Sequence, residues 1–156
     1  MIQYKPGAIG ALTDEYEKAL NELKDVLKQI SDEVFLETNK SENEDFKSIK
    51  NIVLHITRSG YIYSNYIRNH FNDTIFPYQI NINSVDEAME ELNKMFLYNV
   101  QTLEDKWLMS DEQMMKTIIK TSWTTYDLEA IIEHSIVHIL RHRLQIQKLI
   151  KKIKNT

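Results

Sequence analysis

The sequence predicts an all-α protein built as a four-helix bundle. Of its 156 residues only 3 are glycine and 2 are proline, which leaves little material for tight turns. Apolar residues repeat at the 3.6-residue period of a helix in four segments, and polar or helix-breaking residues separate these segments. A chain of this length can bury one substantial core, so we expect residues 1–156 to form a single domain.

The first helix is predicted from about Ile9 to Ile30, after the helix-breaking pair Pro6 and Gly7. Its core-facing stripe is expected to comprise Leu12, Tyr16, Ala19, Leu20, Leu23, Val26, Leu27 and Ile30. The polar and acidic residues 31–47 follow, a long connection for a bundle. We therefore expect this connection to contain a short turn of helix or to cross one end of the molecule.

The second and third helices each begin at a serine. Ser48 is a candidate N-cap for a helix that continues to His70, and residues 72–83 then break the helical pattern. Residues Ser84–Glu87 have the spacing of a capping box, which opens a third helix to about Leu108. The bundle is thus expected to have long connections after its first and third helices.

The segment from residue 110 to 125 allows two interpretations. Residues Ser110–Gln113 have the pattern of a capped helical turn, whereas residues 116–123 are rich in β-branched side chains and favour an extended strand. The last helix is expected to begin near Thr124 or Thr125 and to continue to about Lys154, because that stretch contains no glycine or proline.

Charge and composition exclude several function classes. The net charge of -4 opposes binding to a phosphate backbone, so we expect no nucleic-acid partner. The lysines that follow residue 147 form a local basic cluster, for which compensation of the helix dipole is the favoured interpretation. No stretch approaches the ~20 apolar residues of a membrane span, and residues 1–6 lack the pattern of a secretion signal. We therefore expect a cytoplasmic protein without a membrane partner.

The absence of cysteine leaves histidine and carboxylates as the strong metal ligands. Three of the five histidines, His134, His138 and His142, follow one another at four-residue spacing in the predicted last helix. This spacing places imidazoles on adjacent turns of one helix face, where two of them can bind one metal ion. The zinc-protease motif H-E-x-x-H is excluded, because Glu133 precedes His134 and the interval to His138 holds only Ser, Ile and Val.

A helical wheel distinguishes the three histidines. Relative to the centre of the apolar face, His142 lies at ~20–40°, His138 at ~60–80° and His134 beyond ~100°. His138 and His142 are therefore the expected interior pair. His134 lies at the flank, as an alternative ligand or a partner of the ligands, and it is also the nearest candidate for a general base.

A third ligand must come from elsewhere, and the remaining histidines are His55 and His70. His55 lies in the middle of the second predicted helix and is favoured by its depth, although its wheel position is at the edge of the apolar stripe. His70 comes at the end of that helix, where we expect a surface residue that compensates the helix dipole.

Two motifs resemble those of the DinB-like (DinB/YfiT-like) metalloenzyme family. The first is Ser48–His55, which ends in a histidine and is followed by the aromatic-rich Tyr61–Tyr66. The second is the series of three histidines, extended by Arg143 and Gln145, which is similar to the H-x-x-x-H-R-G-Q pattern that closes the family's last helix. Leu144 replaces the frequent glycine of that pattern.

The resemblance implies a four-helix fold with a divalent-metal site formed by His55, His138 and His142. Zinc and nickel are the first candidates for the ion, followed by iron and copper, since imidazole suits all four. Enzymes of the family include transferases and isomerases that depend on a low-molecular-weight thiol, so a small-molecule substrate of this kind is implied. Tyr61, Tyr66, Arg58 and Arg141 are candidate substrate contacts, for which packing or surface exposure is the favoured interpretation.

A noncatalytic function is the alternative, in which a metal-stabilised helical protein acts by dimerising or by binding a partner. Val137, Leu140 and Leu144 form a second apolar strip on the last predicted helix, and we expect this strip to lie opposite the histidines. An apolar strip of this kind indicates a deeply buried helix or contact with another subunit. Both functional hypotheses are thus compatible with a homodimer.

Overall fold

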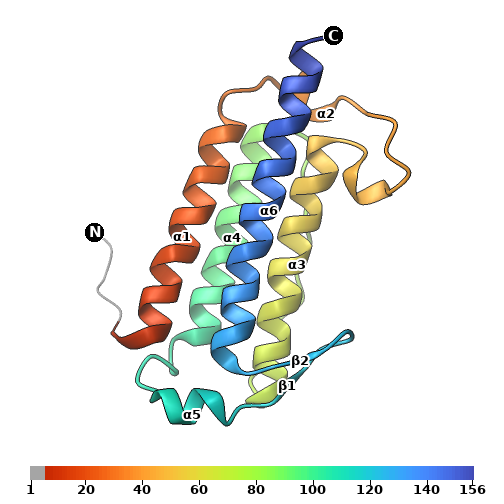
Figure 1. The fold of residues 1–156 in the computed structure, drawn as a ribbon. Coiled ribbons are helices and arrows are strands. Elements are labelled where there is room, and N and C mark those ends of the chain that lie inside the picture. The colour runs from red at the N-terminus through yellow and green to blue at the C-terminus, as the bar shows by residue number, and fades with distance from the viewer. Residues whose placement is uncertain (1–5) are drawn as a thin grey trace.

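Four long helices pack side by side in the computed structural model, which describes residues 6–156 (Figure 1). They are α1 (Gly7–Leu27), α3 (Ile49–His70), α4 (Val85–Leu103) and α6 (Leu128–Lys154). The predicted all-α class and bundle are confirmed. Residues 1–5, on which most of the expectation about a secretion signal rests, lie outside the described range. Among the described residues, no helix combines the length and apolar character that a membrane span requires.

Helices α3 and α4 run in the same direction, and α1 and α6 run in the opposite direction (Figure 1). The side chains of Lys50 and Asn83 meet near the starts of α3 and α4, and those of Arg68 and Thr102 meet near their ends. Because α3 and α4 are parallel, residues 71–84 return along the full length of the bundle. The sequence pattern predicted a break between two helices at these residues. It did not predict that the connection spans the length of the bundle.

Apolar burial explains why these elements pack as they do. Most of the predicted stripe of α1 is buried, including Leu23 and Leu27, which have no exposed surface. Leu12, Val26 and Ile30 are only half-buried, since they lie at the edges of the stripe. Gly60 marks a close approach of α3 to α4, because a Cβ at this position would lie 2.3 Å from Sδ of Met95.

The first connection satisfies both expectations, since it contains short helices and crosses one end of the bundle. It holds α2 (Asp32–Leu36) and the 3₁₀ turn η1 (Glu44–Phe46). The backbone N–H of Asn39 donates to the carbonyl of Lys47 at 2.7 Å, and the Asn51 side chain donates to the carbonyl of Glu44 at 2.7 Å. These bonds fix η1 against the first turn of α3.

Helix α4 differs from its prediction at both ends. Ser84 caps it by accepting a hydrogen bond from the N–H of Glu87, but the Glu87 carboxylate accepts from the N–H of Asn83 instead of Ser84, so the predicted capping box is only half formed. The helix ends at Leu103 instead of Leu108, because Lys106 turns into the protein to reach two aspartates.

Both interpretations of residues 110–125 apply, each to a different part. A complete capping box between Ser110 and Gln113 opens the short helix α5 (Asp111–Met115). The strands β1 (Ile119–Lys120) and β2 (Thr125–Tyr126) then pair in antiparallel fashion. The prediction that α6 begins near Thr124 or Thr125 was therefore wrong, since Asp127 is its N-cap and Leu128 its first residue.

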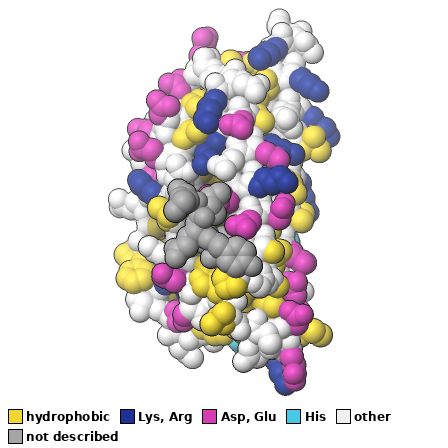
Figure 2. Space-filling view, turned by 90° about the vertical axis from the view of Figure 1, so that its left-hand side faces the viewer, with side chains coloured by type: hydrophobic (Ala, Val, Ile, Leu, Met, Phe, Trp, Pro, Cys, Tyr) yellow, Lys and Arg dark blue, Asp and Glu magenta, His cyan; other side chains and the backbone are white. Residues whose placement is uncertain are grey.

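Charged side chains of both signs are intermixed on the face of the molecule that carries α1 (Figure 2). Lys18 and Glu15 form an exposed pair on this helix, and Asp25 forms another with Lys28, the residue that follows the helix. Exposed pairs of this kind contribute little to stability.

Candidate metal centre

His55 on α3 faces His138 and His142 on α6, because these two helices are antiparallel neighbours. The Nε2 atoms of His55 and His138 are 3.1 Å apart, and one ring nitrogen from each of the three histidines lies within 4.8 Å of the others. In the range 6–156, no other group of histidine, aspartate and glutamate side chains is arranged to hold an ion. The structure thus brings together the three residues that the sequence indicated.

Side chains behind the histidines hold two of the rings in place. Nδ1–H of His142 donates to Oε1 of Gln145 at 2.8 Å. Nδ1 of His55 lies 3.3 Å from Oδ2 of Asp45, which η1 positions beside the first turns of α3. A proton held at Nδ1 leaves Nε2 with its lone pair free, so both contacts favour the tautomer that binds a metal ion through Nε2.

The three imidazoles are neutral at physiological pH. Burial lowers the pKa of His138 to about 3, and repulsion from Arg141 and between histidines that are protonated together lowers it further. Burial also lowers the pKa of His55 and of His142, although Asp45 opposes the shift at His55. Because His55 is neutral, its contact with Asp45 is polar but is not an ion pair. Neutral imidazole is the form that coordinates a metal ion.

The donor set fits a divalent ion such as zinc. Nitrogens bound to a tetrahedral zinc at ~2.1 Å lie ~3.4 Å apart, close to the 3.1 Å between His55 and His138. Three protein ligands leave one position open, as in catalytic zinc sites. A pocket of about 550 Å³ lies in front of the histidines and is lined by Phe46, His55, His138, Arg141, His142, Leu144, Gln145 and Lys148. We call this the histidine pocket.

His134 and His70 lie outside the three-histidine group. His134 is half-buried, its Nε2 lies 3.4 Å from the Tyr63 hydroxyl, and its ring contacts that of Tyr126. Its ring centre is 6.4 Å from that of His138, so a role beside the ligands stays a prediction. His70 ends α3 and packs against Phe71, as expected for a terminal residue.

The four candidate substrate contacts have different positions. Tyr61 is stacked on Tyr78, at 4.0 Å between ring centres; Tyr78 belongs to residues 71–84, which we call the crossover segment. The Tyr66 hydroxyl accepts a hydrogen bond from the N–H of Ser122 in the turn between β1 and β2. Arg141 lines the histidine pocket, whereas Arg58 is close enough for its charge to lower the pKa of His55.

Sequence reasoning missed Asp45 and Phe46 and misplaced Leu144. Phe46 packs on the rings of His55 and His142, at 5.7 and 5.5 Å between centres. The sequence feature that could have indicated Asp45 and Phe46 is their position in a connection expected to cross one end of the bundle. Leu144 lines the histidine pocket and does not lie opposite the histidines, so that part of the predicted strip was wrong.

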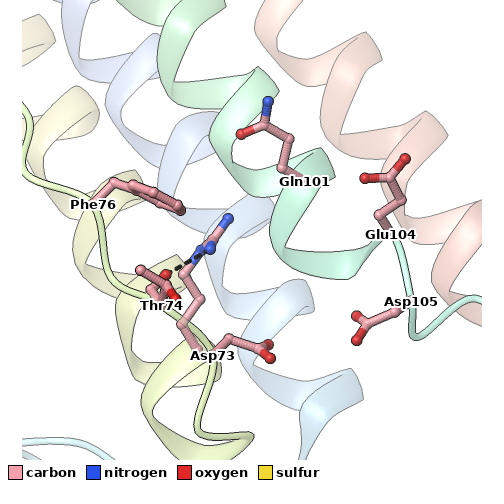
Figure 3. Close-up of a pocket in the computed structure, with 7 residues that line it drawn as sticks. Asp73, Thr74, Phe76, Gln101, Glu104 and Asp105 are labelled. Carbon is pink, nitrogen blue, oxygen red and sulfur yellow. Dashed lines mark hydrogen bonds between the residues drawn. The ribbon is translucent and has the colours of Figure 1, made fainter.

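A second pocket, of about 490 Å³, lies between the far ends of α3 and α4 (Figure 3). We call it the Arg68 pocket; its walls are formed by Arg68, Asp73, Thr74, Phe76, Gln101, Glu104 and Asp105. The guanidinium of Arg68 donates to the Thr74 carbonyl and the Thr102 hydroxyl, and Lys106 pairs with Asp73 and Asp105. This pocket has no histidine, and its buried cations bind groups of the protein itself.

Comparison with known proteins identifies the family. The model of the DinB family matches residues 8–153, which is nearly the whole chain. A comparison with curated proteins gave no match. Together with the four-helix fold and the three-histidine cluster, the extent of the family match confirms the resemblance seen in the two motifs. The chain belongs to the DinB family.

Proposed function

We propose that this protein is a divalent-metal-dependent enzyme with His55, His138 and His142 as ligands. The observation that carries the proposal is the convergence of three neutral imidazoles behind one open pocket. Zinc and nickel are the first candidates, followed by iron and copper, because the ligands are all imidazoles. Asp45 and Gln145 support the same assignment, since they orient two of the rings.

The proposed reaction is a thiol-dependent transfer or isomerisation of a small molecule. A divalent ion bound by three neutral ligands keeps its full charge and would lower the pKa of a thiol or a water molecule in the open position. The chain contains no cysteine, so the thiol must come from a separate low-molecular-weight compound. Phe46 and Leu144 provide apolar contact for a substrate in the histidine pocket.

The metal content of protein purified without a histidine tag tests the site. We expect about one ion per chain in the wild type and a nearly complete loss in His138→Ala and His55→Ala, because two imidazoles bind a divalent ion poorly. His70→Ala is the matched control, since His70 lies outside the three-histidine group and should leave the stoichiometry unchanged. Full metal occupancy in His138→Ala would contradict the proposed ligand set.

The reaction class needs a separate test with the metal-loaded protein. We expect consumption of a low-molecular-weight thiol in the presence of a suitable electrophile, followed with a thiol-specific dye. The His55→Ala variant, treated with the same metal, is the control for uncatalysed transfer. If no thiol is consumed with a varied set of electrophiles, the noncatalytic alternative is favoured.

Exposed apolar side chains on α6 favour a homodimer, through which the protein would act in the noncatalytic alternative and which is also compatible with an enzyme. Val137, Leu140 and Leu144 are 47%, 37% and 52% exposed. We propose that Val137 and Leu140 are covered in a homodimer. We further propose that the protein is cytoplasmic and has no nucleic-acid or membrane partner. Light scattering tests this, since Val137→Glu with Leu140→Glu should halve the measured mass. A wild-type mass equal to that of one chain would contradict the dimer.

A further inference from the structure

Three cations lie around the histidine pocket without an acidic partner. Arg141 and Lys148 line the pocket, and Arg58 lies near His55. In the described part of the chain, none of the three forms an ion pair or a hydrogen bond. The acidic side chain that contacts the histidines is Asp45. The pocket is therefore locally positive in a protein whose net charge is -4.

The two lining cations lie on either side of His142 along α6. Arg141 directly precedes His142 and follows His138 by three residues. Side chains of a helix lean toward its N-terminus, so the Arg141 guanidinium is directed back toward His138. Lys148 lies beyond Gln145 on the same side of the helix. A ligand in front of the histidines would thus have a positive group at each end.

Two of the remaining lining residues are apolar, and the third is Gln145. Phe46 comes from η1, while Leu144 lies on α6 and is 52% exposed although it is apolar. Exposed apolar surface next to unpaired cations suits a ligand with an anionic group and a short apolar part. The volume of about 550 Å³ is within the usual range for a small-molecule site.

We infer that the histidine pocket binds a small oxyanion, a carboxylate or a phosphate ester, through Arg141 and Lys148. Its apolar part then rests on Phe46 and Leu144, beside the proposed ion. The planar guanidinium of Arg141 matches the two oxygens of such a group, and the local positive charge attracts anions from solution. The inference deepens the proposed function. It rests on that proposal only for the metal ion beside the bound oxyanion.

Calorimetric titration of the metal-free protein tests this site independently of the ion. Succinate and inorganic phosphate are the probes, because they distinguish the two sources of oxyanion. The test variant is Arg141→Gln with Lys148→Gln. Its matched control is Lys151→Gln with Lys154→Gln, which removes the same charge from the same helix outside the pocket. Metal content is measured in parallel on all variants.

We expect the wild type to bind at least one probe, and the test variant to bind it about tenfold more weakly, since charge-assisted hydrogen bonds are lost. The control variant should change the affinity by no more than about twofold, because exposed charges outside the pocket are screened. The inference is overturned if the wild type binds neither probe, or if the test and control variants bind equally. Loss of metal in His138→Ala with unchanged anion binding would support both proposals separately.

Discussion

The Arg68 pocket and the histidine pocket lie toward opposite ends of α3 and use their cations in opposite ways. In the Arg68 pocket, Arg68 and Lys106 are 6% and 3% exposed, and their hydrogen bonds go to side chains and a carbonyl of the same protein. In the histidine pocket, Arg141 and Lys148 are exposed and have no ion-pair partner within the described residues. The buried groups there are neutral imidazoles.

This difference separates groups that maintain the fold from groups that are available to a ligand. A buried charge is costly unless the protein satisfies it, so Arg68 and Lys106 need their partners for stability. An exposed cation remains hydrated and can exchange water for a ligand at little cost. The neutral histidines are likewise available to an ion, because Asp45 and Gln145 contact the Nδ1 atoms of His55 and His142, and Nε2 of His55 faces Nε2 of His138, another proposed ligand.

The largest expected effect is the loss of protein stability when Arg68, the buried cation of the Arg68 pocket, is replaced. We expect Arg68→Ala to lower the free energy of unfolding by about 3 kcal/mol, since two charge-assisted hydrogen bonds and the packing of the side-chain stem are lost. Arg141→Ala should change it by no more than about 0.5 kcal/mol, as for most surface substitutions. Urea unfolding of the metal-free proteins measures both values.

Arg68→Met separates the two causes, because methionine retains much of the stem packing. Its destabilisation should therefore be smaller than that of Arg68→Ala. Equal losses in Arg68→Ala and Arg141→Ala would remove the contrast between the two pockets.

The second effect is a pH dependence that arises in the histidine pocket. An unfolded histidine binds a proton below about pH 6.5, whereas burial holds the pKa of folded His138 at about 3. The unfolded chain thus binds more protons in this interval, and stability is lost as the pH falls. For His138 alone the loss is about 1.5 kcal/mol between pH 6.5 and about pH 5.

Urea unfolding of the metal-free protein at these two pH values measures the slope of the free energy of unfolding against pH. The His138→Gln substitution should reduce this slope. His55 and His142 shift in the same direction, so some slope should remain in this variant. An identical slope in wild type and His138→Gln would show that His138 is protonated normally in the folded protein.

The smallest effect concerns a residue behind the ligands. We expect Asp45→Ala to weaken metal binding about tenfold, because the carboxylate that orients the His55 ring is removed. Competition with a colorimetric chelator measures the affinity. Glu42→Ala is the matched control, since it removes the same charge from the same connection without a contact to a histidine. Equal affinities of the two variants would exclude an orienting role for Asp45.

Much of the bundle could be predicted from the sequence, because helical periodicity is a local property. The apolar repeats located all four helices, and the wheel placed His138 and His142 inside, where they are 7% and 5% exposed. Ser48 was recognised as a cap because its side chain acts on the N–H of Asn51, only three residues away. Local hydrogen-bond chemistry and spacing therefore predicted these features well.

Other features depend on how distant segments meet, and periodicity does not contain this information. The parallel arrangement of α3 and α4 follows from the path of residues 71–84, which no local pattern specifies. Asp45 reaches His55 only because the connection folds back onto α3. The strand pair before α6 likewise depends on contact between residues 119 and 126, so the start of α6 was placed too early.

The separation of His55 from His138 in sequence gives the metal centre a consequence for the chain as a whole. The two residues are 83 positions apart, on helices from opposite halves of the sequence. An ion bound to both closes a loop that includes α4 and the whole crossover segment, and closing a long loop removes much conformational freedom from the unfolded chain. In a protein without cysteine, the ion would thus act as a reversible cross-link, comparable to a disulfide that a chelator can open.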